Sequence, residues 1–429
     1  MSTQSLLSYT KPPPASLHRA PSYTAEPLES EQRIALNDRS RPRSTGSFIK
    51  HSKHGHARLR LTAQEDGIAM PVYGVTGLIE GIVELDAEKA EGVDSVEVKI
   101  EGRLKLNEIA EGGKSSVKLV LDTKLLWVKG PSNQDCLHTL DFALTLPATF
   151  EHDGITYPLP PTYSVKLKGV PGFDASIEYS VSATINRPNT VPHMVPLVNS
   201  KKLGIHIGTT IVSTPFLYYP RTRPSLPLPP TPTWRSSEGF DLASNWQTFE
   251  AISKAKKSRI QDILVKLHVP KSRIFSFTQR IPFHVTFEST AVSLAAFLPF
   301  GPSPGPPNPE ATMKIEVLRQ ATVDLSDGIR VVTEARQDMW RIDCIGQGAF
   351  NYTGNETTVS AFSGEIGIFD SVQIGGFRAA GLSVKDCVVL SMSPPDPGKC
   401  PFRDFRLIVP IHLATNPWTT DGAGIGSSN

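Results

Sequence analysis

The chain has 429 residues, 39% of them hydrophobic, and its 44 Lys and Arg nearly balance its 42 Asp and Glu. This length exceeds one ordinary β-sandwich and suits two hydrophobic cores of about 100 to 200 residues each. No apolar run is long enough for a membrane span, the N-terminus lacks the pattern of a secretory signal, and the four cysteines have no metal or disulfide spacing. These features argue against a membrane-spanning or secreted class and predict a cytoplasmic protein of two domains.

Basic residues are concentrated near the N-terminus. Residues 1–63 contain ten Lys and Arg against four Asp and Glu, and residues 39–60 include no acidic side chain. Few large apolar residues accompany this charge, so the sequence predicts a disordered basic tail over residues 1–63. We expect the tail to be weakly attracted to anionic membranes, and we expect no nucleic-acid partner because only Phe48 is available for base stacking. The basic residues of this candidate lipid contact are Arg39, Arg41, Arg43, Lys50, Lys53, Arg58 and Arg60.

Strict alternation of apolar and polar residues follows the tail. From Ala175 to Ile185 every odd position is apolar and every even position is polar, and Val96–Ile100 shows the same pattern. A period of two is typical of half-buried strands in antiparallel sheets. The sequence therefore predicts an all-β fold, with a first β-sandwich over residues 64–187.

Residues 188–257 are rich in Pro and Thr and predict a connector, because proline cannot donate a hydrogen bond within a central strand. Within it, Arg221, Pro224 and Pro227 match the basic-plus-PxxP pattern of ligands for proline-binding domains. Such matches are also common in linkers without a partner, and both interpretations remain open. Apolar residues near the end of the connector have helical spacing, which favours a short helix over residues 241–255.

Alternating strands resume after the connector and predict a second β-sandwich over residues 258–418. The stretches Ile263–Val269, Ile281–Phe287 and Phe405–Leu413 each place an apolar residue at every second position. Residues 419–429 are rich in Gly and Ser and are predicted to be frayed. Three histidines occupy polar positions of these strands, where we expect exposed or edge side chains; they are His268, His284 and His412.

The segment Pro160-Pro161-Thr162-Tyr163 matches the Pro-Pro-x-Tyr ligand of WW domains, which bind an accessible polyproline segment. Strand alternation continues from Tyr163 through Val165 and Leu167, however, which favours a strand that starts after the prolines and turns Tyr163 towards the core. A WW ligand and a paired strand need different surroundings for the same residues, so the two interpretations exclude each other.

Catalytic motifs are not expected in this chain. Gly112-Gly-Lys-Ser115 ends like a phosphate-binding loop but lacks the upstream glycine, and we interpret it as a hairpin turn. The sequence predicts neither a nucleophile elbow nor a His-Glu-x-x-His metal site. His51, His54 and His56 have no nearby carboxylate or thiolate to complete a metal site. We therefore expect no catalytic residue, no metal and no cofactor.

Three groups of segments resemble the arrestin-like proteins of fungi. The first group is Val96-Glu-Val-Lys-Ile-Glu-Gly102 followed by Leu125-Leu-Trp127. The second group is Leu140–Pro147, Tyr157–Tyr163 and Ala175–Ile185, in the order of the second half of an arrestin N-terminal domain. The third group is Ile281–Val285, Lys314–Arg319 and Val409–Trp418. The resemblance covers residues 68–187 and, more loosely, residues 258–418.

This resemblance implies two immunoglobulin-like β-sandwiches packed end to end, acting as a non-catalytic adaptor between membrane-protein cargo and the trafficking or ubiquitination machinery. It also implies a position in the cytoplasm, peripheral to the plasma membrane or endosomes. Fungal members recruit WW-containing HECT ubiquitin ligases through Pro-Pro-x-Tyr motifs in long C-terminal tails. Only eleven residues follow Trp418 here and they hold no such motif, so direct ligase recruitment stays open.

Two other functions remain as alternatives. A structural coat-type trafficking subunit, similar to the arrestin-shaped component of retromer, would bind its partners constitutively and at a fixed ratio. A lipid- or sugar-binding sandwich would require a concave apolar or aromatic pocket.

Overall fold

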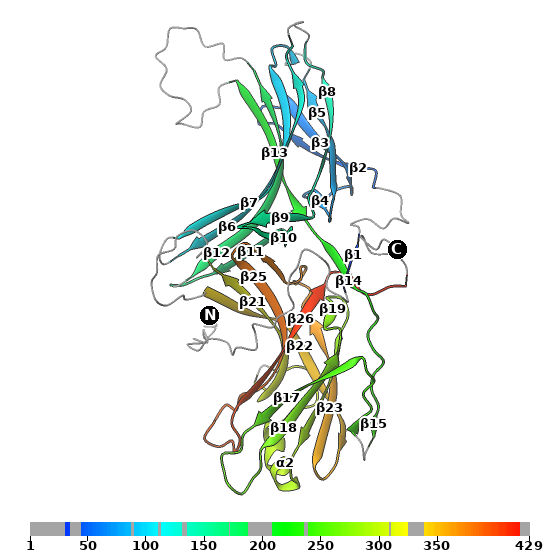
Figure 1. Cartoon of the computed structure of the whole chain (residues 1–429), viewed down its shortest axis with the longest axis vertical. Helices are drawn as coiled ribbons and strands as arrows, with labels where there is room; N and C mark the ends of the chain where they lie inside the picture. Colours follow the sequence, from blue (N-terminus) through cyan, green and yellow to red (C-terminus); the bar gives the residue numbers. More distant parts are fainter. Residues whose placement is uncertain are drawn as a thin grey trace.

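The structure is a computed structural model and describes residues 31–34, 44–86, 90–109, 113–130, 135–170, 172–187, 208–235, 239–308, 310–324 and 339–420. The molecule is elongated, and its strands form an upper and a lower region along the long axis (Figure 1). Nearly all regular structure in these ranges is β; a short helix, α2 (Ala291–Phe297), and a 3₁₀ turn, η3 (Leu298–Phe300), belong to the lower region. The predicted all-β class is confirmed.

The upper region contains two large sheets and a small hairpin. The first sheet, in the order β2-β3-β5-β8, consists of β2 (Gly46–His51), β3 (Ala57–Gln64), β5 (Leu78–Leu85) and β8 (Thr139–Thr145). The second has the order β4-β13-β12-β6-β7, with β11 beside β12. Its strands are β4 (Val72–Tyr73), β6 (Ser95–Glu108), β7 (Lys114–Val128), β11 (Tyr163–Leu167), β12 (Phe173–Asn186) and β13 (Thr209–Tyr218). The hairpin pairs β9 (Thr149–His152) with β10 (Ile155–Pro158).

The long strands β6 and β12 pair antiparallel in one unbroken register. The apolar residues of both predicted alternations are buried, so the period-two prediction is confirmed for this sheet. Gly102 of β6 faces the ring of Tyr179, and a Cβ there would lie 2.6 Å from a ring carbon. The Tyr179 hydroxyl in turn donates a hydrogen bond of 2.6 Å to the carbonyl oxygen of Pro160. Glycine therefore lets a buried tyrosine anchor the segment that leads into β11.

The lower region is built on one sheet of ten strands, in the order β17-β18-β20-β23-β22-β21-β25-β26-β19, with β24 beside β25. The sheet curls, because β17 at its edge also lies against β26. Its strands are β17 (Trp246–Ser253), β18 (Ile263–Pro270), β19 (Ile274–Ser276), β20 (Ile281–Glu288), β21 (Met313–Val323), β22 (Met339–Asn355), β23 (Val359–Ile368), β24 (Phe377–Ala379), β25 (Leu382–Met392) and β26 (Phe405–Ala414).

Buried apolar side chains form two clusters, one in each region. The lower cluster contains the predicted core residues of β18, β20 and β26. The upper cluster, however, also includes residues of the lower sheet: Ala321, Val323, Phe377, Ala379, Ala380, Leu382 and Val384. The expectation of two independent cores is therefore wrong on this point, since the end of the lower sheet closes the bottom of the upper core.

The predicted disordered tail contains three strands, β1 (Glu31–Ile34), β2 and β3, so the prediction is wrong there. Arginines between the apolar residues concealed the alternation of β3. Leu59 is fully buried, whereas the flanking Arg58 and Arg60 point outward and form ion pairs with Glu84 of β5. Residues 1–30 and 35–43 lie outside the described part of the chain.

Much of the predicted connector is also sheet. β13 completes the upper sheet beside β12, β14 (Arg221–Pro224) pairs with β1, and β17 pairs with β18. The short helix predicted over residues 241–255 is therefore wrong; its Thr248 and Ile252 are β-branched and favour an extended backbone. Between β14 and β17 lies the two-stranded hairpin β15 (Trp234–Arg235) and β16 (Gly239–Phe240).

Candidate functional site

The upper and lower regions meet at a junction, which we define by the six segments that build it: residues 31–34, 158–163, 218–224, 319–323, 374–386 and 412–419. These segments are far apart in the sequence, and they come from both ends of the described chain as well as from its middle (Figure 1). The junction concentrates buried charged side chains, which makes it the candidate functional site.

The N-terminal strand β1 is fixed in the junction by its backbone and by a side chain. It pairs antiparallel with β14, and Glu31 lies opposite Pro224. His412 Nε2 lies 2.9 Å from Glu31 Oε1, and both side chains are less than a tenth exposed. Burial alone would lower the pKa of His412, but the charge and hydrogen bond of Glu31 raise it above its ordinary value. A buried imidazolium–carboxylate pair therefore attaches β1 to β26, and the expectation that His412 is exposed is wrong.

A second buried ion pair joins β21 to β25. Arg319 and Asp386 lie opposite each other in the sheet register. The guanidinium donates from Nε and Nη2 to the two carboxylate oxygens at 2.8 and 2.9 Å, and Nη2 also donates to the carbonyl oxygen of Ile374 at 2.7 Å. The Asp386 side chain is 0% exposed and that of Arg319 is 9% exposed. Since both charges are removed from water, losing Asp386 would take the paired carboxylate away from a buried guanidinium.

Polar side chains also tie β14 to the segment that follows β26. Arg223 donates from Nε to Gln32 Oε1 and from Nη1 to Thr419 Oγ1, each at 2.9 Å. Arg221 Nε donates to Asn416 Oδ1 at 3.1 Å. β14 thus holds the N-terminal strand on one side and the chain beyond β26 on the other.

The Pro-Pro-x-Tyr match lies inside this junction. Pro160 and Pro161 are buried and Tyr163 is half-buried. Tyr163 opens β11, which pairs with β12, and its ring meets the ring of Phe377 edge to face with 5.1 Å between centroids. The three residues are therefore placed as parts of a strand and an interface, and the prolines do not present the open surface that a WW groove requires.

The other proline pattern is divided between a strand and an exposed segment. Arg221 is half-buried, Pro224 is buried within β14, and Pro227 is exposed. Only the part after β14 therefore presents proline to a partner.

Four of the seven basic residues lie on the β2–β3 hairpin of the upper region. Lys50, Lys53 and Arg58 are exposed and Arg60 is half-buried. The other three, Arg39, Arg41 and Arg43, lie outside the described residues. The four described basic residues lie on β2, on β3 and in the turn between these paired strands, outside the segments that define the junction. They therefore form a separate candidate surface.

A cavity of about 110 Å³ opens within the junction. Charged side chains of Glu31, Arg33 and His412 line one part of it, and Pro160 and Phe377 line another. A cavity lined by both charged and apolar side chains fits the binding of a chain segment better than it fits catalysis, because no nucleophile lies next to a base among its described lining residues.

The described residues provide no arrangement typical of catalysis. Burial raises the pKa of the Cys136 thiol to about 11 and that of Cys387 to about 12, so neither is a ready nucleophile. Gly301–Gly305 does have Gly-x-Ser-x-Gly spacing, but Ser303 is exposed in a proline-rich loop after η3 and not at a strand-to-helix turn. In the same residues no group of His, Cys, Asp and Glu could hold a metal ion, and no helix is long and apolar enough to cross a membrane.

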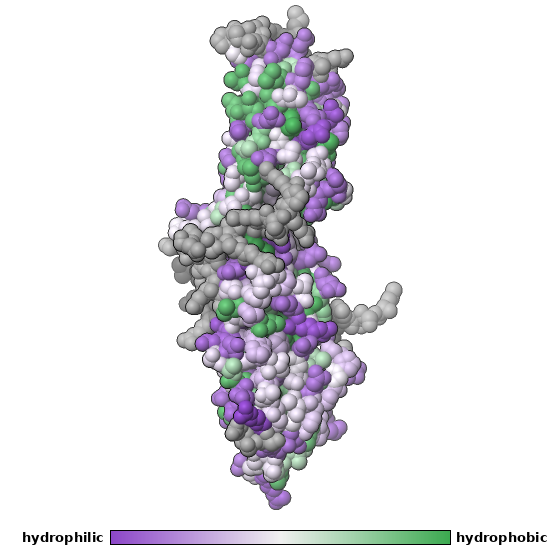
Figure 2. All heavy atoms as spheres, turned by 90° about the vertical axis from the view of Figure 1, so that its right-hand side faces the viewer, coloured by the Kyte–Doolittle hydropathy of each residue, from purple (hydrophilic) through white to green (hydrophobic). Residues whose placement is uncertain are grey.

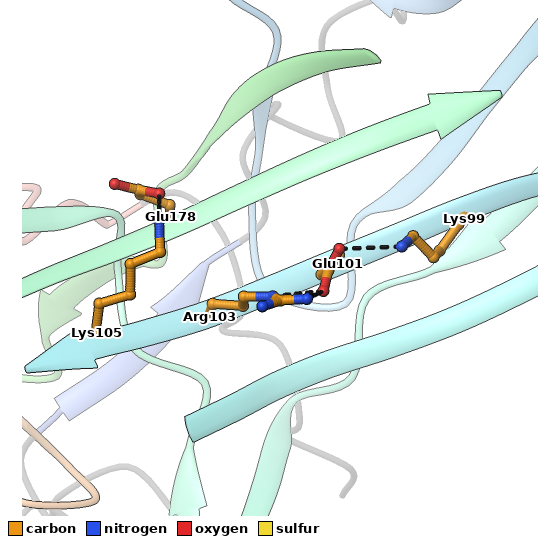
Figure 3. Close-up of polar contacts among 5 residues, drawn as sticks. All are labelled: Lys99, Glu101, Arg103, Lys105 and Glu178. Atoms are coloured by element: carbon orange, nitrogen blue, oxygen red, sulfur yellow. Dashed lines mark hydrogen bonds and ion pairs between the residues drawn. The ribbon is translucent and has the colours of Figure 1, made fainter. Parts of the chain in front are cut away.

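Charged residues on the outer face of the upper sheet differ from those of the junction (Figure 3). Lys105 Nζ lies 2.6 Å from Glu178 Oε2, and Lys99 Nζ lies 3.1 Å from Glu101 Oε2. The hydrogen bond from Lys105 lowers the pKa of Glu178. The Lys105 and Glu178 side chains are 45% and 59% exposed, so this pair is screened by water and contributes little to stability.

Three of the four residues in the buried ion pairs of the junction, Glu31, Arg319 and Asp386, were not among the candidate site residues predicted from the sequence. The sequence pattern could nevertheless have indicated that Arg319 and Asp386 are buried, since each occupies a position that is otherwise apolar in an alternating strand. Glu31 lies in a segment predicted to be disordered and offered no such signal. No protein-family model matches the chain, and no curated protein sequence matches it.

Proposed function

We propose that the chain is a non-catalytic, arrestin-like adaptor, built from two immunoglobulin-like β-sandwich domains packed end to end, that links membrane-protein cargo to the trafficking or ubiquitination machinery. Support comes from the resemblance of its segments to fungal arrestin-like proteins and from the two apolar clusters of antiparallel strands. The cytoplasmic side of the plasma membrane or of endosomes is where such an adaptor acts.

The observation that carries the proposal is the junction. The buried pair of Glu31 with His412 joins the first described strand to β26, and the pair of Arg319 with Asp386 lies in the lower sheet where that sheet meets the upper region. An adaptor needs two surfaces held at a defined placement, and the pairing of β1 with β14 and β26 fixes both ends of the described chain at this contact. The described residues, by contrast, bring no nucleophile, base and oxyanion donor together.

Co-purification from the cells that make the protein tests this function. The full chain is tagged, cross-linked in intact cells and extracted with detergent, and its partners are identified by mass spectrometry. Integral membrane proteins recovered at varying, substoichiometric ratios support an adaptor. Recovery of large soluble partners at one fixed ratio would instead support the coat-type subunit, and recovery of neither would contradict both functions.

Variants of matched chemistry show whether the junction matters for cargo. Arg319→Met combined with Asp386→Leu removes a buried ion pair, while Lys105→Ala combined with Glu178→Ala removes an exposed one (Figure 3). We expect the first pair of substitutions to change the set of recovered cargo and the second to leave it unchanged. If both double variants change the recovered cargo to the same extent, binding of cargo does not depend on how the two regions are placed.

Ligase recruitment, under this proposal, does not use Pro160, Pro161 and Tyr163 of the folded chain. The accessible segment of residues 225–232, which includes the exposed Pro227, or a separate partner protein provides the contact. A peptide of residues 156–167 is expected to bind WW domains, whereas the folded protein is expected to bind them only through residues 225–232. Binding of the folded protein that Tyr163→Ala abolishes, with an unchanged melting temperature, would overturn this.

Membrane contact, in the same proposal, runs through the β2–β3 hairpin. Each basic residue near an anionic surface contributes roughly 1 kcal/mol. Lys50→Gln, Lys53→Gln and Arg58→Gln together should abolish binding to vesicles that contain phosphatidylserine at low salt. Removal of three basic charges from the outer face of β6, at Lys99, Arg103 and Lys105, is the matched control; if it weakens binding equally, the hairpin is not the contact.

A further inference from the structure

Two histidines lie side by side on the outer face of the lower sheet. His268 of β18 and His284 of β20 are direct partners in the antiparallel register. Their neighbours in each strand, such as Leu267 and Phe283, point to the lower core, so the histidines point away from it. Even so, His268 is only 5% exposed and His284 only 2% exposed. The expectation of exposed histidines is wrong for both, because another part of the chain covers them.

The cover is the segment between β14 and β17, described over residues 225–235 and 239–245, which we call the strap. Figure 2 views the molecule from the side on which β15 lies in Figure 1. Phe240 of β16 lies over both histidines, with ring centroids 4.7 Å from His284 and 5.9 Å from His268. Trp246, the first residue of β17, meets His284 edge to face at 4.9 Å. The two imidazoles are thus enclosed between the sheet and aromatic rings.

Further contacts fix the strap to the sheet. Trp234 packs edge to face on Phe240 with 5.0 Å between centroids, and it sits so close to Gly354 of β22 that a Cβ there would lie 2.3 Å from the indole nitrogen. Trp246 Nε1 donates to the carbonyl oxygen of Pro230 at 3.2 Å. The strap therefore rests on the sheet through Phe240 at the histidine pair, through Trp234 at Gly354, and through Leu228 against the lower core.

The surroundings of the two rings favour their neutral forms. His268 Nδ1 is 2.8 Å from Thr248 Oγ1, and within the described residues neither ring nitrogen of His284 has a hydrogen-bond partner. Burial lowers the pKa of each histidine to about 4; Lys266 adds to the effect at His268, and His268 adds to it at His284. Neutral imidazoles are therefore part of the closed arrangement.

No counter-charge in the described residues pairs with either ring. Charged groups also lie on the strands around the two rings: Lys266 of β18, Glu288 of β20, Glu250 of β17, Glu365 of β23 and Glu356 after β22. The described part of the strap carries Arg235 and Asp241. Lys266 is paired with Glu288 at 2.7 Å, Arg280 with Glu365 at 3.9 Å, and Arg235 with Asp241 at 3.0 Å. Glu238 of the strap lies outside the described residues.

We propose that the strap is a proton-operated cover, released from the lower sheet when His268 and His284 take up protons. Two protonated rings on neighbouring strands repel each other and need water, and movement of Phe240 away from them exposes both rings to it. The aromatic rings attract a cation but supply no opposite charge to neutralise the pair. Release uncovers the outer faces of β18 and β20 and frees the segment that links β14 to β17. This device is independent of the adaptor function.

The direction and size of the pH effect on strap opening follow from the different pKa values of the histidines in the open and closed forms. The open form takes up protons near pH 6.5, and the closed form only near pH 4, so acid favours opening between these values. Each histidine should then raise the opening equilibrium on the order of 10-fold at pH 5 relative to pH 7.5. Opening should leave the cores folded, because the histidines face away from them.

Hydrogen exchange of the full chain, corrected for intrinsic rates, measures this opening. We expect amides of residues 239–245 to lose protection at pH 5.0 relative to pH 7.5 while amides of β6 and β12 keep theirs. His268→Gln with His284→Phe keeps a hydrogen-bonding group and a ring but removes both titrations, so its strap should stay protected at pH 5.0. His138→Gln, at an exposed histidine of the upper region, should change nothing.

A second variant keeps the proposal testable if the double substitution does not fold. Phe240→Ala removes the ring that covers both histidines, so its strap should already exchange at pH 7.5 as fast as the unaltered strap does at pH 5.0. The proposal is overturned if protection of the unaltered strap is the same at both pH values. It is equally overturned if His268→Gln with His284→Phe loses protection in acid as the unaltered chain does.

Discussion

The buried pair of Arg319 and Asp386 offers the sharpest test of the junction. Asp386→Ala removes a carboxylate that is 0% exposed and that accepts two hydrogen bonds from one guanidinium. Arg319 then keeps its hydrogen bond to the carbonyl oxygen of Ile374 but loses the carboxylate of Asp386 in a place that water hardly reaches. The substitution thus exposes the desolvation cost that the pair normally offsets.

The magnitude follows from what happens to the remaining charge. Removing one partner of a buried pair destabilises a protein by about 3–5 kcal/mol, whereas replacing both partners by apolar residues of similar volume is often neutral or stabilising. For domains of this size 1 kcal/mol shifts the melting temperature by roughly 2–4 °C. We therefore expect Asp386→Ala to lower it by about 6–20 °C, and Arg319→Met with Asp386→Leu to restore most of that loss.

Thermal unfolding followed by circular dichroism provides the measurement, and hydrogen exchange in β21 and β25 locates the effect. The exposed pair Lys105 and Glu178 is the control, and its loss should change stability by at most about 1 kcal/mol. If Asp386→Ala melts like the unaltered chain, or if the apolar double variant melts as low as Asp386→Ala, the reasoning about an uncompensated buried charge is refuted.

Three further predictions concern single side chains. Tyr163→Ala should lower the stability of the chain by about 2 kcal/mol, because a half-buried ring loses its contact with Phe377; an unchanged melting temperature would argue against the junction contact. Phe283→Ala, in the lower core, should cost about 3–5 kcal/mol in urea unfolding, while Glu178→Ala should stay within about 1 kcal/mol. Iodoacetamide should modify the exposed Cys344 before the buried Cys387, read by peptide mass spectrometry, and the reverse order would contradict the burial of these thiols.

The sequence predicted the strands well wherever a buried face alternates with a polar one. The pattern of Ala175–Ile185 identifies β12 because alternate side chains point to opposite faces of the sheet. The apolar ones pack in the upper core, and the polar ones lie on the other face. The same rule failed for β3, where Arg58 and Arg60 alternate with the buried Leu59 and Leu61. Counting these charges without noting that they occupy every second position makes the segment resemble a solvated tail. The rule failed for β17 because three apolar residues can satisfy a helical spacing by chance while the strand is fixed by pairing with β18.

The candidate site was less accessible to sequence reasoning, since its residues come together only through the tertiary fold. Arg319 interrupts the apolar series of Ile315, Val317 and Ala321, and a charge at such a position predicts a buried partner without naming it. The partner, Asp386, interrupts the series of β25 in the same way. Two charges at core positions of neighbouring strands are thus a signal for a buried pair, but only once the pairing of the strands is known.

The last prediction uses the contrast between His412 and the strap histidines. The pKa of His412 is raised, so its pairing with Glu31 contributes fully below pH 6.5 and is lost as the pH rises through the raised value. His268 and His284, with a pKa lowered to about 4, contribute fully above pH 6.5 and are lost as the pH falls towards 4. Protection of β1 and β14 should therefore decrease as the pH rises above 6.5, while protection of the strap should decrease as the pH falls from 6.5 to 5. His412→Gln should make β1 exchange alike at all these pH values without altering the strap. If β1 and the strap instead lose protection in the same direction, a general loss of stability governs both, and the opposite environments of these histidines do not control the two attachments.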